Sequence, residues 1–296
     1  MLLKKNVPIS FIVGKIKKDF IAILIFSIVV GTIDQIKLVH IPLTSATILG
    51  TAISLLLAFR TAQAYDRWWE ARKIWGEIVN NSRTLIRELQ IFIVKPEASG
   101  VIKKTVSLQS CWCYCLGESL RKQSCLNTLE KYLNNEQIKY CLEHKNIPNA
   151  ILNLIAQEIQ SLHENKTIND FQQIKLAQTL SVLCDCMGKA ERIKNTIFPL
   201  TYSIVLRFLI YLFAFLFPLC LTDYPFYIEL ILNILISCSF FLIENTATYK
   251  QDPFEGLPTD VAITQIAQNI EINLKQMIND KVIPQENEKI EGFYVL

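Results

Sequence analysis

The sequence has little charge, few glycines and few histidines. Asp, Glu, Lys and Arg make up 19% of the 296 residues, whereas soluble domains carry roughly 25%, and 51% of the residues are apolar. So high an apolar share excludes intrinsic disorder, a collagen-like fibre and a secreted disulfide scaffold. The net charge of +3 is too small to indicate nucleic-acid binding. The chain is therefore either an apolar soluble protein or a membrane protein with a large water-exposed portion.

The motifs of common enzymes are also missing. The sequence contains no GxxxxGK(S/T) phosphate loop, no GxGxxG turn, no HExxH helix and no GxSxG elbow. The histidines, His40, His144 and His163, form no paired motif. We therefore expect neither an enzyme nor a cofactor.

Nine cysteines are present, an odd number, and seven of them fall between residues 111 and 186. Two short runs, 111–115 (CWCYC) and 184–186 (CDC), raise the question of a metal. Zinc ligands usually stand further apart and are completed by another Cys or His pair, and side chains two apart on a helix do not face each other. We expect buried, reduced thiols and no metal site, with metal binding as the minor alternative.

What the sequence does contain is four stretches almost free of charge. They come as two pairs, each joined by a short polar turn, and cover residues 20–33, 41–59, 208–222 and 224–243. Each is near or below the roughly 20 apolar residues that cross a bilayer. The paired arrangement predicts two helical hairpins in a membrane.

Flanking charge predicts the direction of these hairpins. Lys and Arg cluster before the first stretch, after the second and before the third, whereas the two turns hold only Lys37. By the positive-inside rule, the protein is a multi-pass protein of the cell (inner) membrane with both termini cytoplasmic. No small-residue cleavage site follows the first stretch, which predicts a retained span rather than a signal peptide.

These features predict four regions. An N-terminal arm with the first hairpin covers 1–60, a helical cytoplasmic body 61–195, the second hairpin 196–245, and a cytoplasmic loop, helix and tail 246–296. Apolar residues recur at helical spacing through the body, residues 66–89 continue the second apolar stretch without a breaker, and Asp170 is placed to cap a helix. The apolar faces exceed what one thin body can bury, so we expect partner subunits.

Three segments together resemble the bestrophin family. They are 64–72 (AYDRWWEAR), with Asp66, Arg67, Trp68 and Trp69; 191–202 (ERIKNTIFPLTY), with Glu191, Arg192, Pro199 and Tyr202; and 252–260 (DPFEGLPTD), with Pro253 and Phe254. Their order and spacing fit the family over nearly the whole chain. The resemblance implies an all-α membrane protein with four transmembrane helices in two hairpins and a helical cytoplasmic body. It also implies a homopentamer around a central pore, with the lipid bilayer and permeant monovalent ions as its other partners and no nucleic acid.

The resemblance places a narrow pore neck on the second membrane helix. Counting back from Arg67 gives Thr51, Leu55 and Phe59. Steps of four put them on one helical stripe, and rings of apolar side chains control permeation through wetting. Packing between helices is the alternative. Thr51 departs from the usual aliphatic residue, and one aromatic ring replaces the two of animal members, which leaves the anion preference open.

The family also has a second constriction and, in animals, a calcium site. The constriction corresponds to Leu180, with Leu183 as its neighbour, and core packing is an equal alternative. The calcium clasp of animal members needs a run of Asp residues that is missing after the last span. We therefore expect a channel that is not gated by Ca²⁺ bound in such a clasp, and we expect no bound metal.

The predicted function is passive transmembrane flow of small monovalent ions, with chloride and other anions foremost. Two alternatives stay open, namely a monovalent-cation channel of the same fold and a non-conducting membrane scaffold. The tail, 284–296, either clasps a neighbouring subunit or is disordered.

Overall fold

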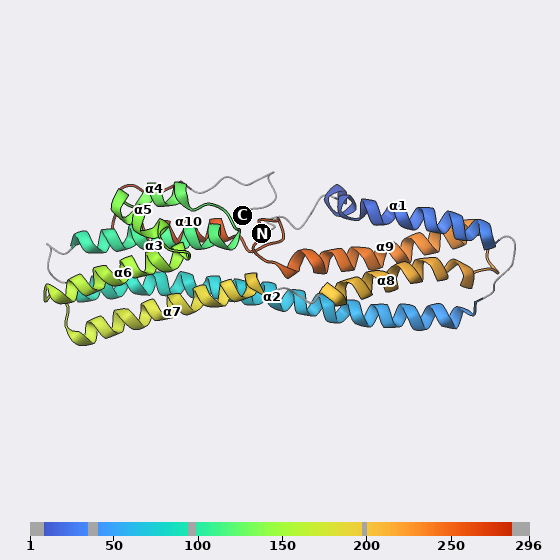
Figure 1. Ribbon diagram of the computed structural model, residues 1–296, viewed down its shortest axis with the longest axis horizontal. Coiled ribbons are helices and arrows are strands. Elements are labelled where there is room, and N and C mark those ends of the chain that lie inside the picture. Colours follow the sequence, from blue (N-terminus) through green and yellow to red (C-terminus); the bar gives the residue numbers. More distant parts are fainter. Residues whose placement is uncertain (1–8, 35–40, 94–98, 197–199, 286–296) are drawn as a thin grey trace. The chain divides into compact units, whose positions relative to one another are not determined.

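The computed structural model describes residues 9–34, 41–93, 99–196 and 200–285 (Figure 1). These residues form helices, and no strand occurs among them. The elements are α1 Ile9–Asp34, α2 Leu43–Phe92, α3 Ser99–Leu120, α4 Leu126–Tyr132, α5 Asn135–Leu142, α6 Ile147–Glu164, α7 Asp170–Asn195, α8 Leu200–Leu216, the 3-10 turn η2 Pro218–Cys220, α9 Phe226–Gln251 and α10 Ile263–Met277. The predicted all-α class is confirmed.

The chain divides into two compact units. The hairpin unit comprises residues 4–68 and 197–251, and the body unit comprises residues 1–3, 69–196 and 252–296. The predicted boundaries at 60, 195 and 245 stay predictions. Residues 35–40 of the first predicted turn, Pro199 and residues 286–296 of the tail lie outside the described residues.

Each of the four apolar stretches lies on a helix of the hairpin unit. Stretch 20–33 lies in α1, 41–59 begins α2, 208–222 extends from α8 into η2, and 224–243 lies largely in α9. The third helix stops earlier than its apolar stretch because Pro218 follows Leu216 closely and cannot continue the backbone ladder. Within the described part of the chain, α2 and α9 are long and apolar enough to cross a membrane, and α8 is a shorter apolar helix.

α2 is one helix of 50 residues, which confirms that 66–89 continues the second apolar stretch. Pro42 comes just before its first residue, where a missing backbone N–H costs nothing. Hydroxyls along its apolar part bond to the helix's own carbonyls, for example Thr51 to Thr47 O and Ser54 to Gly50 O, both at 2.8 Å. These bonds satisfy polar groups that have no other donor or acceptor on an apolar surface.

The core of the hairpin unit is made by side chains from α1, α2, α8 and α9. Ile53 and Leu57 of α2 pack with Ile210 of α8, Phe241 of α9 and Ile23 of α1. Outside this core the unit leaves large apolar side chains exposed, which is unusual for a protein surface in water.

The body unit is built around α3, which packs against α6, α10, α7 and α4. Trp112 of α3 and Trp75 of α2 are its largest fully buried side chains. A Cβ atom added at Gly117 would lie 2.7 Å from Cγ2 of Ile263, so only glycine allows α10 to approach α3 this closely.

The start of α7 differs from the prediction. Asn169, not Asp170, is the N-cap residue, and its side chain accepts a hydrogen bond from the Gln172 N–H at 2.9 Å. The Gln172 side chain accepts in turn from the Asn169 N–H, also at 2.9 Å. This reciprocal capping box satisfies two helix donors, whereas Asp170 is already the first helical residue and contacts His163.

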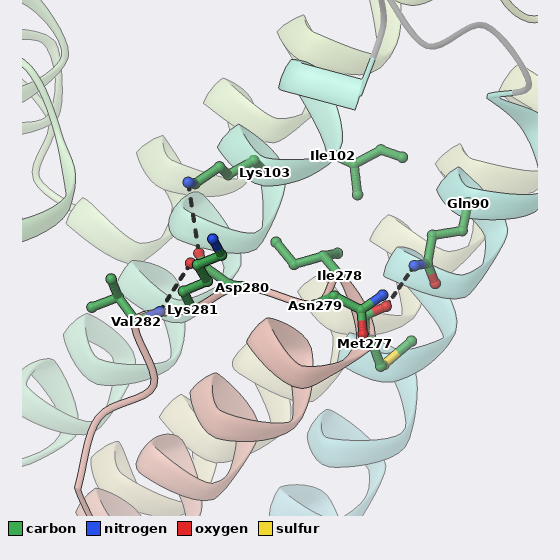
Figure 2. Close-up of a pocket in the computed structure, with 9 residues that line it drawn as sticks. All are labelled: Gln90, Ile102, Lys103, Met277, Ile278, Asn279, Asp280, Lys281 and Val282. Atoms are coloured by element: carbon green, nitrogen blue, oxygen red, sulfur yellow. Dashed lines mark hydrogen bonds and ion pairs between the residues drawn. The ribbon is translucent and has the colours of Figure 1, made fainter.

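The body unit also contains a hollow of about 610 Å³ at the end of α10 (Figure 2). Gln90 Nε2 donates to the Met277 carbonyl at 2.8 Å, and the Asp280 carboxylate lies 3.8 Å from Lys103 Nζ and accepts from the Val282 N–H. These bonds hold the end of α10 against α2 and α3.

Candidate functional site

The candidate neck residues lie on the face of α2 that points away from the core of their own unit. Leu55 and Phe59 are 58% and 59% exposed, and Thr51 is also exposed. Ile53 and Leu57, one helical face away, are buried. Packing within a single subunit therefore does not account for the stripe.

A buried charge cluster holds a neighbouring face of α2, one residue after Phe59. Arg60 is 2% exposed, and its Nη2 lies 3.2 Å from Oε1 of the fully buried Glu244 and donates to Thr248 Oγ1 at 2.8 Å. Arg207 of α8 donates to both oxygens of the same carboxylate, at 3.1 and 3.0 Å. Two cations from α2 and α8 thus share one anion of α9. This geometry holds the rotation of α2 about its axis, and with it the direction of Phe59.

Two signature residues also hold α2. The Tyr202 hydroxyl of α8 donates to the Leu56 carbonyl at 2.8 Å, and Arg67 Nε donates to the Gln251 carbonyl at the end of α9, also at 2.8 Å. The Tyr65 and Trp68 rings lie 6.1 Å apart beside this second contact. The side chains next to the stripe therefore serve to position the helix.

A shallow hollow of about 720 Å³ lies beside the stripe, between α2 and α8. Phe59, Leu56 and Gln63 line it from α2, and Tyr202 and Val205 from α8. Its wall is mostly apolar, so it offers an apolar side chain of another molecule a place to pack.

Of the other signature residues that the structure describes, Asp66 is exposed on α2 in the hairpin unit, and the rest belong to the body unit. Glu191 accepts from Asn146 Nδ2 at 2.8 Å, Arg192 pairs with Glu70 at 2.9 Å, and Trp69 is 46% exposed. They form surface contacts.

Hydrogen bonds between side chains and backbone N–H groups of the same segment hold the loop 252–260. Pro253 and Phe254 are buried, and Asp260 accepts from the N–H groups of Gly256 and Leu257 at 2.8 and 3.0 Å. Burial raises the pKa of Asp260 to about 6, and its backbone donors oppose this only in part. Gly256 has φ +85°, a conformation that side chains disfavour. Asp252 pairs with Lys194 and accepts from the Phe254 N–H. Both aspartates thus stabilise the loop itself.

The two candidates for the second constriction differ in burial. Leu183 of α7 is fully buried in the body core, whereas Leu180 is half-buried, and Val182 beside it is 39% exposed. Thr179, the residue before Leu180, is buried, and its hydroxyl donates to the Glu88 carboxylate at 2.8 Å. Of the two leucines, only Leu180 has a face directed away from its own core.

The chain matches the family described as Bacterial/Fungal Bestrophin protein over residues 6–276. It is 32% identical over 238 residues to the voltage-dependent anion channel-forming protein YneE of Escherichia coli (strain K12), covering 80% of this chain and 77% of that one. It is 29% identical over 270 residues to the voltage-dependent anion channel-forming protein alr2987 of Nostoc sp., covering 90% and 88% of the two chains.

The fold has matches among solved structures. The crystal structure of a bacterial bestrophin homolog from Klebsiella pneumoniae is 26% identical, with a TM-score of 0.84, and the match covers 90% of this chain and all of that one. None of these relatives is named as an enzyme, in agreement with the missing catalytic motifs. This chain is a membrane protein and belongs to the bestrophin family.

Proposed function

We propose that the protein is a homopentameric channel of the cell (inner) membrane, through which small monovalent ions, chloride and other anions foremost, flow passively. The names of its relatives as anion channel-forming proteins support the class of ion. The observation that carries the proposal is the exposed stripe of Thr51, Leu55 and Phe59 on α2.

The stripe suits the wall of a narrow pore. Steps of four place leucine and phenylalanine on one face of α2, and an apolar face on a membrane helix suits either lipid or the axis of a narrow pore. In a ring of five subunits the same side chains would face each other across an axis, where they form a barrier that conducts only when wetted. The edges of the Phe59 rings carry partial positive charge, which favours anions.

Exposed apolar side chains of the body unit support association. Phe171 and Ile174 on α7 are 84% and 55% exposed, although α7 buries Leu176 and Leu183 in the core. A helix that is apolar on two faces needs a second partner, and other copies of the chain supply it.

Topology follows from charge. The last turn of α7 carries Arg192 and Lys194 just before the second hairpin, and Lys17 and Lys18 precede the first apolar stretch. These cations support cytoplasmic placement of both termini and of the body.

The reversal potential of the purified protein in a planar bilayer under a KCl gradient tests the function. A reversal potential near the chloride equilibrium value supports the proposal. A value near the potassium equilibrium potential would replace it with a cation channel of the same fold, and silence at every voltage would favour a scaffold. Native mass spectrometry in detergent should give five copies, and any other number overturns the pentamer.

Phe59→Ala sharpens the test of the neck. Removing the ring should raise conductance and change the chloride-to-potassium permeability ratio. Phe215→Ala is the matched control, because Phe215 is 44% exposed but lies on α8, away from the stripe. Equal currents in the two variants would place the barrier elsewhere.

A further inference from the structure

We infer that Cys111, Cys115, Glu118 and Cys125 of the body unit form a binding site for a thiophilic metal ion, with Zn²⁺ as the best fit. Neither the channel function nor the family signature uses these side chains. The inference does not depend on the proposed function.

Helical spacing and a chain reversal bring the four groups together. Cys111, Cys115 and Glu118 are spaced by four and three along α3, which places them on one face. The chain then reverses through Lys122, which has the left-handed φ of +58°, and brings Cys125 back to this face. The ligand atoms of Cys115, Glu118 and Cys125 lie within 4.8 Å of one another.

The distances are close to those of a tetrahedral site. The sulfur atoms of Cys111 and Cys115 are 3.9 Å apart, and Cys125 Sγ lies 3.5 Å from the Cys115 carbonyl oxygen. Zn–S bonds of about 2.3 Å in a tetrahedron place two sulfurs about 3.8 Å apart. Cys111 stands outside the group of three within 4.8 Å and joins it through Cys115, so its side chain has to turn towards Glu118 and Cys125 to complete the site.

The three thiols of the cluster are buried, as the ligands of structural metal sites are, and Glu118 is half-buried. Cys111 and Cys115 are fully buried and Cys125 is 4% exposed. Glu118 lines an enclosed cavity of about 190 Å³, which offers a path of entry. Three thiols and one carboxylate supply the four donors of a closed tetrahedral site, and sulfur selects Zn²⁺ or Cu⁺ over Mg²⁺ and Ca²⁺.

The groups also lack better partners. Glu118 Oε1 accepts from Thr128 Oγ1 at 2.7 Å, but Oε2 is buried with no hydrogen-bond partner among the described residues. Cys125 stands at the N-cap of α4 without making a capping bond, and its thiol is directed to α3 instead. A bound cation would give the free oxygen of Glu118 and the sulfur of Cys125 a partner.

The test uses Co²⁺ as a spectroscopic substitute for Zn²⁺, with the full chain reduced and purified in detergent. We expect one Co²⁺ per subunit, with the sulfur-to-cobalt charge-transfer absorption and the intense visible bands of a tetrahedral thiolate site, all lost when Zn²⁺ is added. Cys115→Ser and Cys125→Ser should weaken binding about tenfold or more and reduce the charge-transfer absorption. Cys141→Ser and Cys184→Ser are the matched controls, since they remove a buried thiol on α5 and an exposed thiol on α7. They should leave the Co²⁺ affinity and the charge-transfer absorption unchanged.

Glu118→Gln covers the possibility that a serine variant fails to fold, because glutamine keeps the acceptor for Thr128. It should weaken Co²⁺ binding while the charge-transfer absorption per bound ion stays. Absence of Co²⁺ binding, or binding without charge-transfer absorption, or binding equal in Cys125→Ser and Cys184→Ser, would each overturn the inference and leave the cysteines as buried thiols.

Discussion

The hairpin unit and the body unit arrange polar and apolar side chains in opposite ways. The hairpin unit buries Arg60 and Glu244 and exposes large apolar groups such as Ile48 and Phe208. The body unit places many ion pairs on its surface, among them Glu77 with Lys189 and Glu70 with Arg192, over an apolar core. A unit surrounded by hydrocarbon must satisfy its polar groups internally, whereas water satisfies those of the body.

Removing Glu244 should break this contrast with the largest effect. Glu244→Ala leaves the cations of Arg60 and Arg207 without their shared anion, and a broken buried pair costs about 3–5 kcal/mol. We expect a large fall in the thermal unfolding temperature of the purified protein and loss of channel current. Glu77→Ala removes an exposed pair, which water screens, and should lower the unfolding temperature far less. Equal effects of the two variants would mean that the buried cluster does not stabilise the hairpin unit.

Asp260 sharpens the contrast, because the body unit buries this carboxylate against backbone donors, with Arg121 as the neighbouring cation. Its pKa is raised to about 6, so the folded protein binds this proton more tightly than the unfolded chain. This group therefore favours folding as the pH falls from about 6 towards 4, by about 1.4 kcal/mol for each unit of raised pKa, and the contribution is lost as the pH rises through 6. Asp260→Asn should flatten the pH dependence of the unfolding temperature in this window. An unchanged slope contradicts the assignment.

Close packing within the body unit makes a third prediction. Gly117→Ala puts a methyl group against Ile263 and should cost about 1–3 kcal/mol in the free energy of unfolding. Ile263→Ala removes the contacting Cγ2 atom, so the double variant should recover part of the loss in a double-mutant cycle. Gly188→Ala, which meets no atom within 4 Å, is the control and should be neutral or slightly stabilising. Additive effects of the two substitutions would show that the contact is not what limits residue 117.

The cap of α7 makes the smallest prediction. Asn169→Ala should cost about 1 kcal/mol, because the Gln172 N–H loses its side-chain acceptor. Asp170→Ala removes only an exposed contact with His163 and a charge near the helix start, worth a few tenths of a kcal/mol. The unfolding temperatures of the two variants show which substitution costs more stability. A larger fall for Asp170→Ala than for Asn169→Ala would mean that Asp170 is the capping residue.

The sequence predicted the elements that depend on local patterns. Continuous apolar stretches gave the four hairpin helices, and the absence of a breaker gave the length of α2. The stripe of Thr51, Leu55 and Phe59 came from the resemblance to the bestrophin family, and its steps of four agree with one face of α2; its role in a pore stays a prediction. The cap of α7 could also have been predicted, because Asn169 and Gln172 have the spacing of a capping box.

Contacts between distant segments could not be predicted in this way. Arg60, Arg207 and Glu244 come from three helices, and no local pattern shows that they share one site. The expectation of isolated buried thiols rests on cysteines two apart, which do not face each other on a helix, whereas Cys111 and Cys115 are four apart and do. Cys125 joins them only through a reversal of the chain.

The hydroxyl of Thr51 has a consequence for the proposed neck. Its proton is donated to the Thr47 carbonyl at 2.8 Å, so the side chain presents lone pairs and a methyl group to its surroundings. A ring of such groups accepts hydrogen bonds from water but offers none to an anion. A chloride ion passing residue 51 would keep its hydration shell. It would lose water, and so encounter the free-energy barrier of dehydration, only deeper in the neck, at Leu55 and Phe59.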